Sequence, residues 1–85
     1  MPYTPEIIDE LKMLCHYNLA NIDEGLKAHH TADPAMIAAL RRLHDKGLVT
    51  HEDGGYLTDL GREAAEHAQA ALTILTSERA LSLQP

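Results

Sequence analysis

A helix near the middle of the chain, with a start signal and a stop signal, constrains the fold more than any other feature. Asp33 can accept hydrogen bonds from free backbone N–H groups, and Pro34 suits the first helical position because it has no N–H. Gly47 is the residue expected at the left-handed position that ends such a helix. The apolar residues between these signals recur at helical spacing, and the predicted buried face is Met36, Ala39, Leu40 and Leu43.

A β-hairpin is predicted directly after this helix. Residues 48–52 and 55–58 form two short runs around Asp53-Gly54, a dipeptide typical of tight hairpin turns. Gly55 also allows a three-residue loop, so the sequence leaves the strand register open. Thr58 is a capping residue, and it predicts that a final helix begins near Asp59.

The final helix has an unusually wide apolar face. Its apolar residues cover close to half of the helical circumference, which is more than a helix packed on one surface requires. This pattern predicts either a homodimer through the final helix or a deeply buried helix in a monomer. The candidate dimer residues are Ala64, Ala68, Ala71, Leu72 and Leu75.

Two further helices are predicted in the first part of the chain. Thr4-Pro5 begins a helix over about residues 5–17. Its predicted buried stripe is Ile7, Ile8, Leu11, Leu14 and Cys15, with Met13 and Tyr17 off the stripe. A capping pattern at Asn21 and Glu24 predicts a short second helix over about residues 22–29. Gly25, inside it, is expected where a neighbouring helix approaches closely.

Length and composition place these elements in one domain of residues 1–85. We expect an ordered core over residues 4–78 and a frayed tail over residues 79–85. The single cysteine, Cys15, excludes an internal disulfide and is typical of a reducing cytosol. No signal peptide and no membrane-spanning run of about 20 apolar residues is evident. We therefore expect a soluble, cytoplasmic, mainly helical protein with a small β-hairpin.

Two sequence patterns resemble known proteins. The pattern L-x-x-L-x-x-KGLV, which begins at Leu40, precedes GYLTDLGRE, which begins at Gly55. Together they resemble the recognition helix and wing of many bacterial transcription regulators. The longer pattern KAHHTADP…RLHDKGLV…DGGYLTDLGREAAEHAQ is similar to a family of short gammaproteobacterial proteins of unassigned function. The first resemblance implies a winged helix-turn-helix fold, with three helices, two strands and a fourth helix, and a DNA-binding, transcription-regulator-like function.

The charge distribution bears on this DNA-binding hypothesis. The net charge of −6 opposes nucleic-acid binding. Between Lys27 and Lys46, however, four Lys or Arg residues face two acids, whereas the rest of the chain has three against eleven. A helix in the major groove would use its outward residues, and ordinary surface charge is the competing interpretation. The candidate DNA-binding residues are Lys27, His29, His30, Thr31, Ala35, Ala38, Arg41, Arg42 and Lys46.

The tip of the predicted hairpin argues for a different function. Glu52 and Asp53 lie where a wing that grips DNA would carry Lys or Arg, and carboxylates repel phosphates. The alternative prediction is therefore a winged-helix protein–protein interaction module that does not bind DNA. A double-stranded DNA partner and a homodimer remain the two partners considered.

No metal, cofactor or enzymatic activity is expected. The pairs His29-His30 and Cys15-His16 are adjacent in sequence, so their side chains diverge on a helix. The chain has no Cys-x-x-Cys pair, no nucleophile elbow and no phosphate-binding loop.

Overall fold

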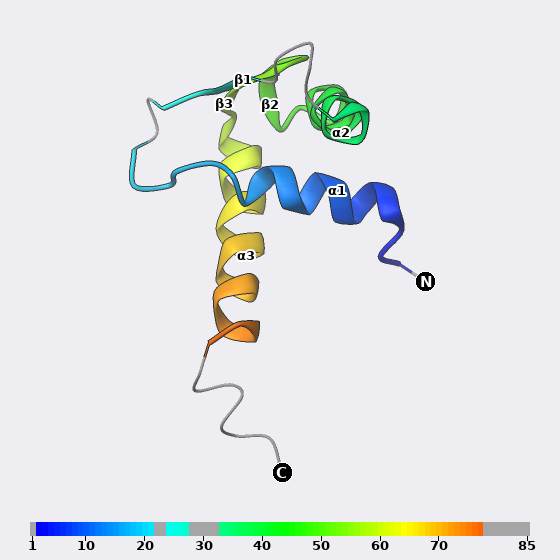
Figure 1. The fold of residues 1–85 in the computed structure, drawn as a ribbon. Helices are drawn as coiled ribbons and strands as arrows, with labels where there is room; N and C mark the ends of the chain where they lie inside the picture. Colours follow the sequence, from blue (N-terminus) through cyan, green and yellow to red (C-terminus); the bar gives the residue numbers. More distant parts are fainter. Residues whose placement is uncertain (1, 22–23, 28–32, 78–85) are drawn as a thin grey trace.

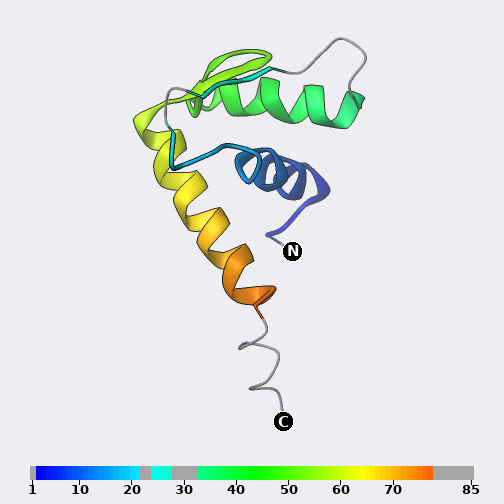
Figure 2. The same ribbon diagram turned by 60° about the vertical axis from the view of Figure 1, so that its left-hand side comes forward.

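The computed structural model describes residues 2–21, 24–27 and 33–77, and within them the chain forms three helices and three strands. Helix α1 (Pro5–Leu14) precedes strand β1 (Leu26–Lys27) and helix α2 (Pro34–Asp45). Strands β2 (Val49–His51) and β3 (Gly54–Leu57) form the hairpin, and helix α3 (Asp59–Leu75) follows. The sheet and α2 lie at one end of the molecule, α1 crosses below α2, and α3 extends away from the sheet beyond α1 (Figures 1 and 2).

Three of the four helix starts predicted from capping residues are confirmed. The Thr4 side chain accepts a hydrogen bond from the Ile7 N–H at 3.2 Å. Asp33 accepts from the Ala35 N–H at 2.9 Å, and proline follows both caps. Thr58 begins α3 and accepts from the Gly61 N–H at 3.0 Å. Side-chain caps satisfy N–H groups that a helix leaves unpaired, so each helix begins where its cap stands.

The short helix predicted over residues 22–29 is wrong where the structure describes that segment. Glu24 and Gly25 are not helical, and the next two residues form β1. β1 pairs antiparallel with β3, which gives a sheet of order β1-β3-β2. The prediction rested on a capping pattern and on local spacing. β1 forms instead because it can pair with strand β3 at the free edge of the hairpin, which is distant in sequence.

Two glycines make room for this extra strand. A Cβ added at Gly54 would come within 3.1 Å of the Leu26 carbonyl carbon, so only glycine allows the strands to approach this closely. A Cβ at Gly25 would lie 3.2 Å from the Gly55 carbonyl oxygen and 3.2 Å from the Tyr56 ring. The close approach predicted at Gly25 thus exists, but it involves β3 rather than a helix.

The hairpin prediction is confirmed, with shorter strands than expected. Val49 pairs with Leu57 and His51 with Gly54, and an irregularity lies between the two pairs. The sequence did not define this register because Gly54 and Gly55 both have positive φ angles, +121° and +72°. Tyr56 lies beside Gly25 and is 46% exposed.

The core forms where α1, α2, the hairpin and α3 meet. The predicted buried face of α2 is confirmed for Ala39, Leu40 and Leu43, with Met36 partly buried. By contrast, Met13 of α1 and Tyr17, which follows α1, are buried although they lie off the predicted stripe. The apolar pattern of α1 is wide enough for two faces, and Leu14 of the predicted stripe is buried together with Met13. α1 is also shorter than predicted and ends at Leu14.

Helix α3 is held against the rest of the protein at two points. A Cβ at Gly61 would come within 2.8 Å of the Leu48 carbonyl carbon, so glycine lets the first turn of α3 lie directly on the chain that enters β2. Farther along, the Gln69 side-chain amide donates to the carbonyls of Leu14 at 3.1 Å and Tyr17 at 2.8 Å. Those carbonyls belong to the end of α1, where helical partners run out. None of the helices described is long and apolar enough to cross a membrane.

Candidate functional site

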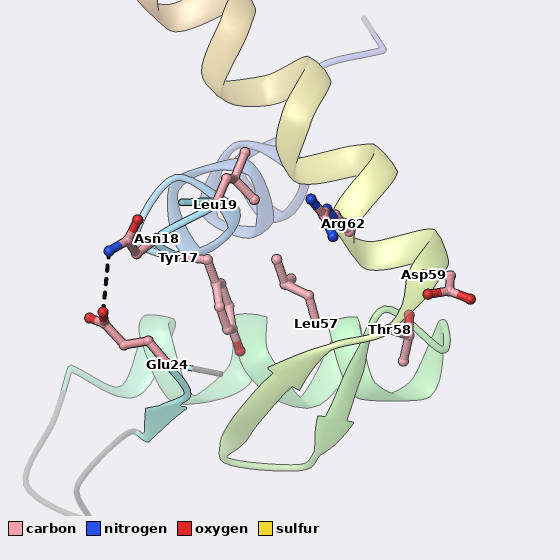
Figure 3. Close-up of a pocket in the computed structure, with 8 residues that line it drawn as sticks. All are labelled: Tyr17, Asn18, Leu19, Glu24, Leu57, Thr58, Asp59 and Arg62. Atoms are coloured by element: carbon pink, nitrogen blue, oxygen red, sulfur yellow. Dashed lines mark hydrogen bonds between the residues drawn. The ribbon is translucent and has the colours of Figure 1, made fainter. Parts of the chain in front are cut away.

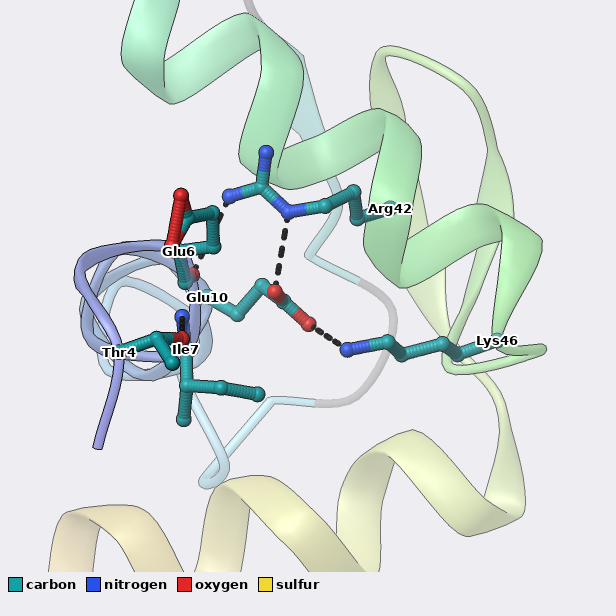
Figure 4. Close-up of polar contacts among 6 residues, drawn as sticks. All are labelled: Thr4, Glu6, Ile7, Glu10, Arg42 and Lys46. Atoms are coloured by element: carbon teal, nitrogen blue, oxygen red, sulfur yellow. Dashed lines mark hydrogen bonds and ion pairs between the residues drawn. The ribbon is translucent and has the colours of Figure 1, made fainter. Parts of the chain in front are cut away.

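A buried carboxylate binds two of the four Lys and Arg residues that were predicted to contact DNA. Glu10, on α1, is 5% exposed. One of its oxygens accepts a hydrogen bond from Arg42 Nε at 3.0 Å, and the other forms an ion pair with Lys46 Nζ (Figure 4). Arg42 Nη2 also donates to the Glu6 carbonyl at 3.2 Å. Arg42 and Lys46 therefore both reach across to α1, where Arg42 is half-buried and Lys46 stays exposed.

The charge of Glu10 depends on these cations. Burial by itself would raise the pKa of the Glu10 carboxyl, since a buried charge loses hydration. The hydrogen bonds and charges of Lys46 and Arg42 outweigh that effect and hold the pKa of Glu10 below its usual range. The three side chains thus join α1 to α2 and largely neutralise one another at neutral pH.

Three of the predicted DNA-binding residues remain exposed on α2. Ala35, Ala38 and Arg41 are exposed, and Arg41 makes no ion pair with a described residue. Lys27 lies in β1 opposite Gly54, away from α2 in sequence. The other predicted residues, His29, His30 and Thr31, lie outside the described residues. Arg41 is thus exposed and unpaired among the described residues, whereas Lys46 is exposed but bound to Glu10.

The acidic tip of the hairpin lies near the buried side chain of Tyr17. Glu52 is exposed and Asp53 is half-buried. Burial, together with the nearby charge of Asp53, raises the pKa of the Tyr17 phenol to about 12. The Tyr17 hydroxyl is buried and makes no hydrogen bond to a described residue. A negative charge near this tip is therefore felt by the core as well as by any approaching phosphate.

A small cavity lies between the end of α1, the hairpin and the first turn of α3. Its lining includes Tyr17, Leu57 and Arg62, and its polar edge carries Asn18, which donates to Glu24 at 3.2 Å (Figure 3). The cavity volume is about 120 Å³. Ligand sites usually occupy roughly 300–1,000 Å³, so this cavity is too small for an organic ligand of ordinary size.

A larger apolar groove lies between α1 and α3. Its volume is about 620 Å³, and its walls are apolar residues of α1 (Ile8, Leu11, Cys15) and of α3 (Ala68, Ala71, Leu75). Lys12, His16 and His67 supply its polar lining, and none of the residues that line it carries a carboxylate. The stripe predicted to be buried on α1 thus divides: Leu14 enters the core, whereas Ile8, Leu11 and Cys15 line this groove.

The wide apolar face predicted for the final helix is largely uncovered. Of the five candidate dimer residues, Ala64 and Ala68 are half-buried against the core, whereas Ala71, Leu72 and Leu75 are exposed. The exposed fractions are 49% for Leu72 and 73% for Leu75, and Ile8 of α1 is 40% exposed. Single exposed apolar residues are ordinary, but large ones gathered along one groove mark a binding surface.

Sequence reasoning missed Glu10 and the contribution of α1 to the groove. The signal for Glu10 was weak, because the residue looks like any other acid of an acidic first helix. Its spacing from Met13, Leu14 and Tyr17 places it on the same helical face as three buried residues, and a carboxylate on that face requires a cation. Arg42 and Lys46 are spaced four residues apart, so both can supply a cation from the same side of α2.

The described residues contain no group of three His, Cys, Asp or Glu side chains arranged to hold a metal ion. No curated protein and no solved structure matches the chain significantly. A family model does match, over residues 1–76, which is most of the chain. The chain therefore belongs to a protein family of unknown function, DUF5669.

Proposed function

We propose that this protein is a protein–protein interaction module of winged-helix type that binds its partner through the groove between α1 and α3. The observation that carries the proposal is the groove itself, an open apolar surface lined by no carboxylate on a chain of net charge −6. Partner surfaces of this kind bury apolar side chains at their centre and keep charges outside.

The winged-helix assignment is supported by the order of the elements. A helix, a short strand, a helix and a hairpin follow one another, and β1 pairs with the second strand of the hairpin. The helix that would precede α2 in a helix-turn-helix is the part of the resemblance that the described residues 24–27 do not supply. Since residues 24–27 are not helical, the described chain does not show this part of the usual support for DNA docking, which favours the interaction function.

DNA binding through α2 is the second candidate, and Arg41 favours it. Arg41 is exposed beside Ala35 and Ala38, whose small side chains would allow α2 to approach a duplex closely. The engagement of Arg42 and Lys46 by Glu10 removes two of the three phosphate contacts that this helix would otherwise offer. Each phosphate contact contributes about 0.9 to the slope of log affinity against log salt, so the expected slope is small.

Titration of the purified protein into random-sequence duplex DNA at two salt concentrations separates the two candidates. The interaction proposal predicts no complex at micromolar protein, both for the natural chain and for Arg41→Ala. It also predicts that Glu10→Gln, which releases Arg42 and Lys46, produces at most weak and salt-sensitive binding. Micromolar binding by the natural chain that Arg41→Ala weakens would overturn the proposal in favour of DNA binding.

A further inference from the structure

The apolar face of α3 combines large and small side chains in a way that a second copy of the same face would match. Ala68 and Ala71 form a low stretch beside Cys15 of α1, and Leu75 stands one turn farther along the helix. Leu75 is 73% exposed, so its side chain projects from the surface. A projecting leucine and an alanine recess on one face are the two halves of an interdigitated helix contact.

We propose that the groove between α1 and α3 is occupied by α3 of a second copy of this chain, in a two-fold dimer with the two α3 helices antiparallel. In this arrangement Leu75 of each copy enters the recess of the other copy between Ala68 and Ala71. A two-fold contact uses the same patch on both molecules, which requires a patch that is complementary to itself. The two-fold axis then passes near Ala71 and Leu72, and α1 and α3 of both copies form a four-helix layer.

The shape of the molecule leaves room for this contact. The later turns of α3 extend past α1 on the side away from the sheet, so a second helix can lie along them without meeting the hairpin (Figures 1 and 2). Leu75, near the end of α3, is the most exposed of the large apolar residues described, and Leu72 beside it in the groove lining is 49% exposed. These residues have no other partner in the described chain that would remove them from water, and their burial is the main gain on association.

The lining of the groove carries few charged side chains. Lys12, His16 and His67 are the ionisable side chains beside the apolar lining, apart from Cys15 and Tyr3, and Lys12 has Asp9 at 4.0 Å on its own helix. Two molecules of net charge −6 repel each other, but they meet here on faces whose lining carries no carboxylate. The acids Glu63 and Glu66 of α3 are exposed and lie outside the groove lining, so they stay in water when the helices pair.

Symmetric disulfide formation tests this arrangement directly. In a Cys15→Ser background, Ala71→Cys places one thiol on each chain near the two-fold axis, within the short distance that a disulfide requires. The matched control is Ala70→Cys, an exposed alanine of the same helix that points about 100° away from Ala71. We expect mild oxidation to convert the Ala71→Cys protein mainly to a covalent dimer and to leave the Ala70→Cys protein mainly monomeric. Equal cross-linking of the two variants would overturn the antiparallel contact.

A charge placed in the interface gives the second measurement. We expect sedimentation equilibrium of the natural chain to give twice the 9.4 kDa mass of one chain, and Leu75→Glu to give one chain mass. Thr73→Glu adds the same charge to an exposed position of the same turn, outside the groove, and should remain dimeric. A monomeric natural chain would overturn this inference.

The inference rests on the proposed interaction function, but the two fail differently. A monomer that does not bind DNA would leave the groove open for another protein, so the proposed function would stand without the dimer. Salt-dependent DNA binding that requires Arg41 would overturn the proposed function whatever the oligomeric state. Sedimentation and the duplex titration therefore report on separate statements.

Discussion

At the scale of single residues, Glu10 decides how the charges of α2 are used. A buried carboxylate without partners is costly, and Arg42 and Lys46 supply partners from the neighbouring helix. The same contacts make the two cations poor ligands for anything outside the protein. Net charge and charge runs in a sequence cannot reveal this, because they do not show which charges neutralise each other in the fold.

The Glu10 ion pairs predict a specific pH dependence of stability. Since the pKa of Glu10 is lowered in the folded protein, its stabilisation is fully present above the unfolded value of about 4.3 and is lost as pH falls through the folded pKa. We expect Glu10→Gln to lower the free energy of unfolding at pH 7 by about 1–2 kcal/mol, less than a fully buried pair because Arg42 and Lys46 are partly exposed.

Urea unfolding at several pH values checks this prediction. The difference between the natural chain and Glu10→Gln should be constant between neutral pH and pH 6 and should shrink below about pH 4.3. Glu6→Gln is the matched control, because Glu6 uses only its backbone carbonyl in these contacts. A difference that does not change with pH would contradict the assignment of Glu10 as a charged partner.

Tyr17 predicts a loss of folding stability at high pH, whereas Glu10 predicts a loss at low pH. Its hydroxyl is buried without a hydrogen bond to a described residue, so Tyr17→Phe removes no such bond and should change stability at pH 7 by less than about 0.5 kcal/mol. Burial raises the pKa of Tyr17 to about 12, whereas an unfolded tyrosine ionises near 10. The natural chain should therefore lose stability from about pH 10 upward, and Tyr17→Phe should lose less.

Absorbance of tyrosinate and unfolding at alkaline pH measure this effect together. Tyr56→Phe removes one of the chain's three phenols at an exposed position and serves as the control. If Tyr17→Phe cost several kcal/mol at pH 7, the hydroxyl would have a partner that contradicts this account.

At the scale of elements, glycines and caps determine how the pieces meet. Gly61 lies in the first turn of α3, against the Leu48 carbonyl. Alanine normally stabilises a helix interior by about 1 kcal/mol relative to glycine, but here a methyl group would overlap the backbone. We expect Gly61→Ala to destabilise the protein by about 1–3 kcal/mol, the usual cost of overpacking.

Thermal or urea unfolding of two glycine variants tests this claim. Gly47 has a φ of +78° and nothing within 4 Å of an added Cβ, so Gly47→Ala reports the backbone cost alone, about 1 kcal/mol. Gly61→Ala should cost more than Gly47→Ala, and both should keep the folded structure. A stabilising Gly61→Ala would show that α3 does not rest on Leu48.

The helix starts and the hairpin were predictable because their signals are local. Thr4, Asp33 and Thr58 each satisfy N–H groups within three residues, so the cap and its helix lie in one short window. β1 was not predictable in this way. Its partner is β3, and a two-residue strand carries too little pattern to be recognised without that partner.

At the scale of the whole molecule, the parts of the site that depend on local spacing were predictable, and the parts that depend on contacts between distant segments were not. The wide apolar face of α3 was evident from the sequence, because spacing alone defines it. The groove was not, because it needs the packing of α1 against α3, which the contacts of Gln69 with the end of α1 help to set. The open basic face was predicted too large, because Glu10 is remote in sequence from the cations that it binds.

We therefore propose that the working surface of the protein lies on α1 and α3 rather than on α2. Burial of the exposed apolar residues of the groove by a second copy would remove them from water and fix the long α3 helix. Residues 78–85, which include the tail predicted to fray, lie outside the described residues.

The reactivity of Cys15 with a thiol reagent, measured against protein concentration, tests this claim most directly. Cys15 is the only cysteine of the chain and lines the groove. We expect the rate to fall as concentration rises, because the second copy covers the thiol, and to be higher and independent of concentration in Leu75→Glu. The same rate at every concentration, in the natural chain and in Leu75→Glu alike, would mean that the groove stays open and would contradict the account.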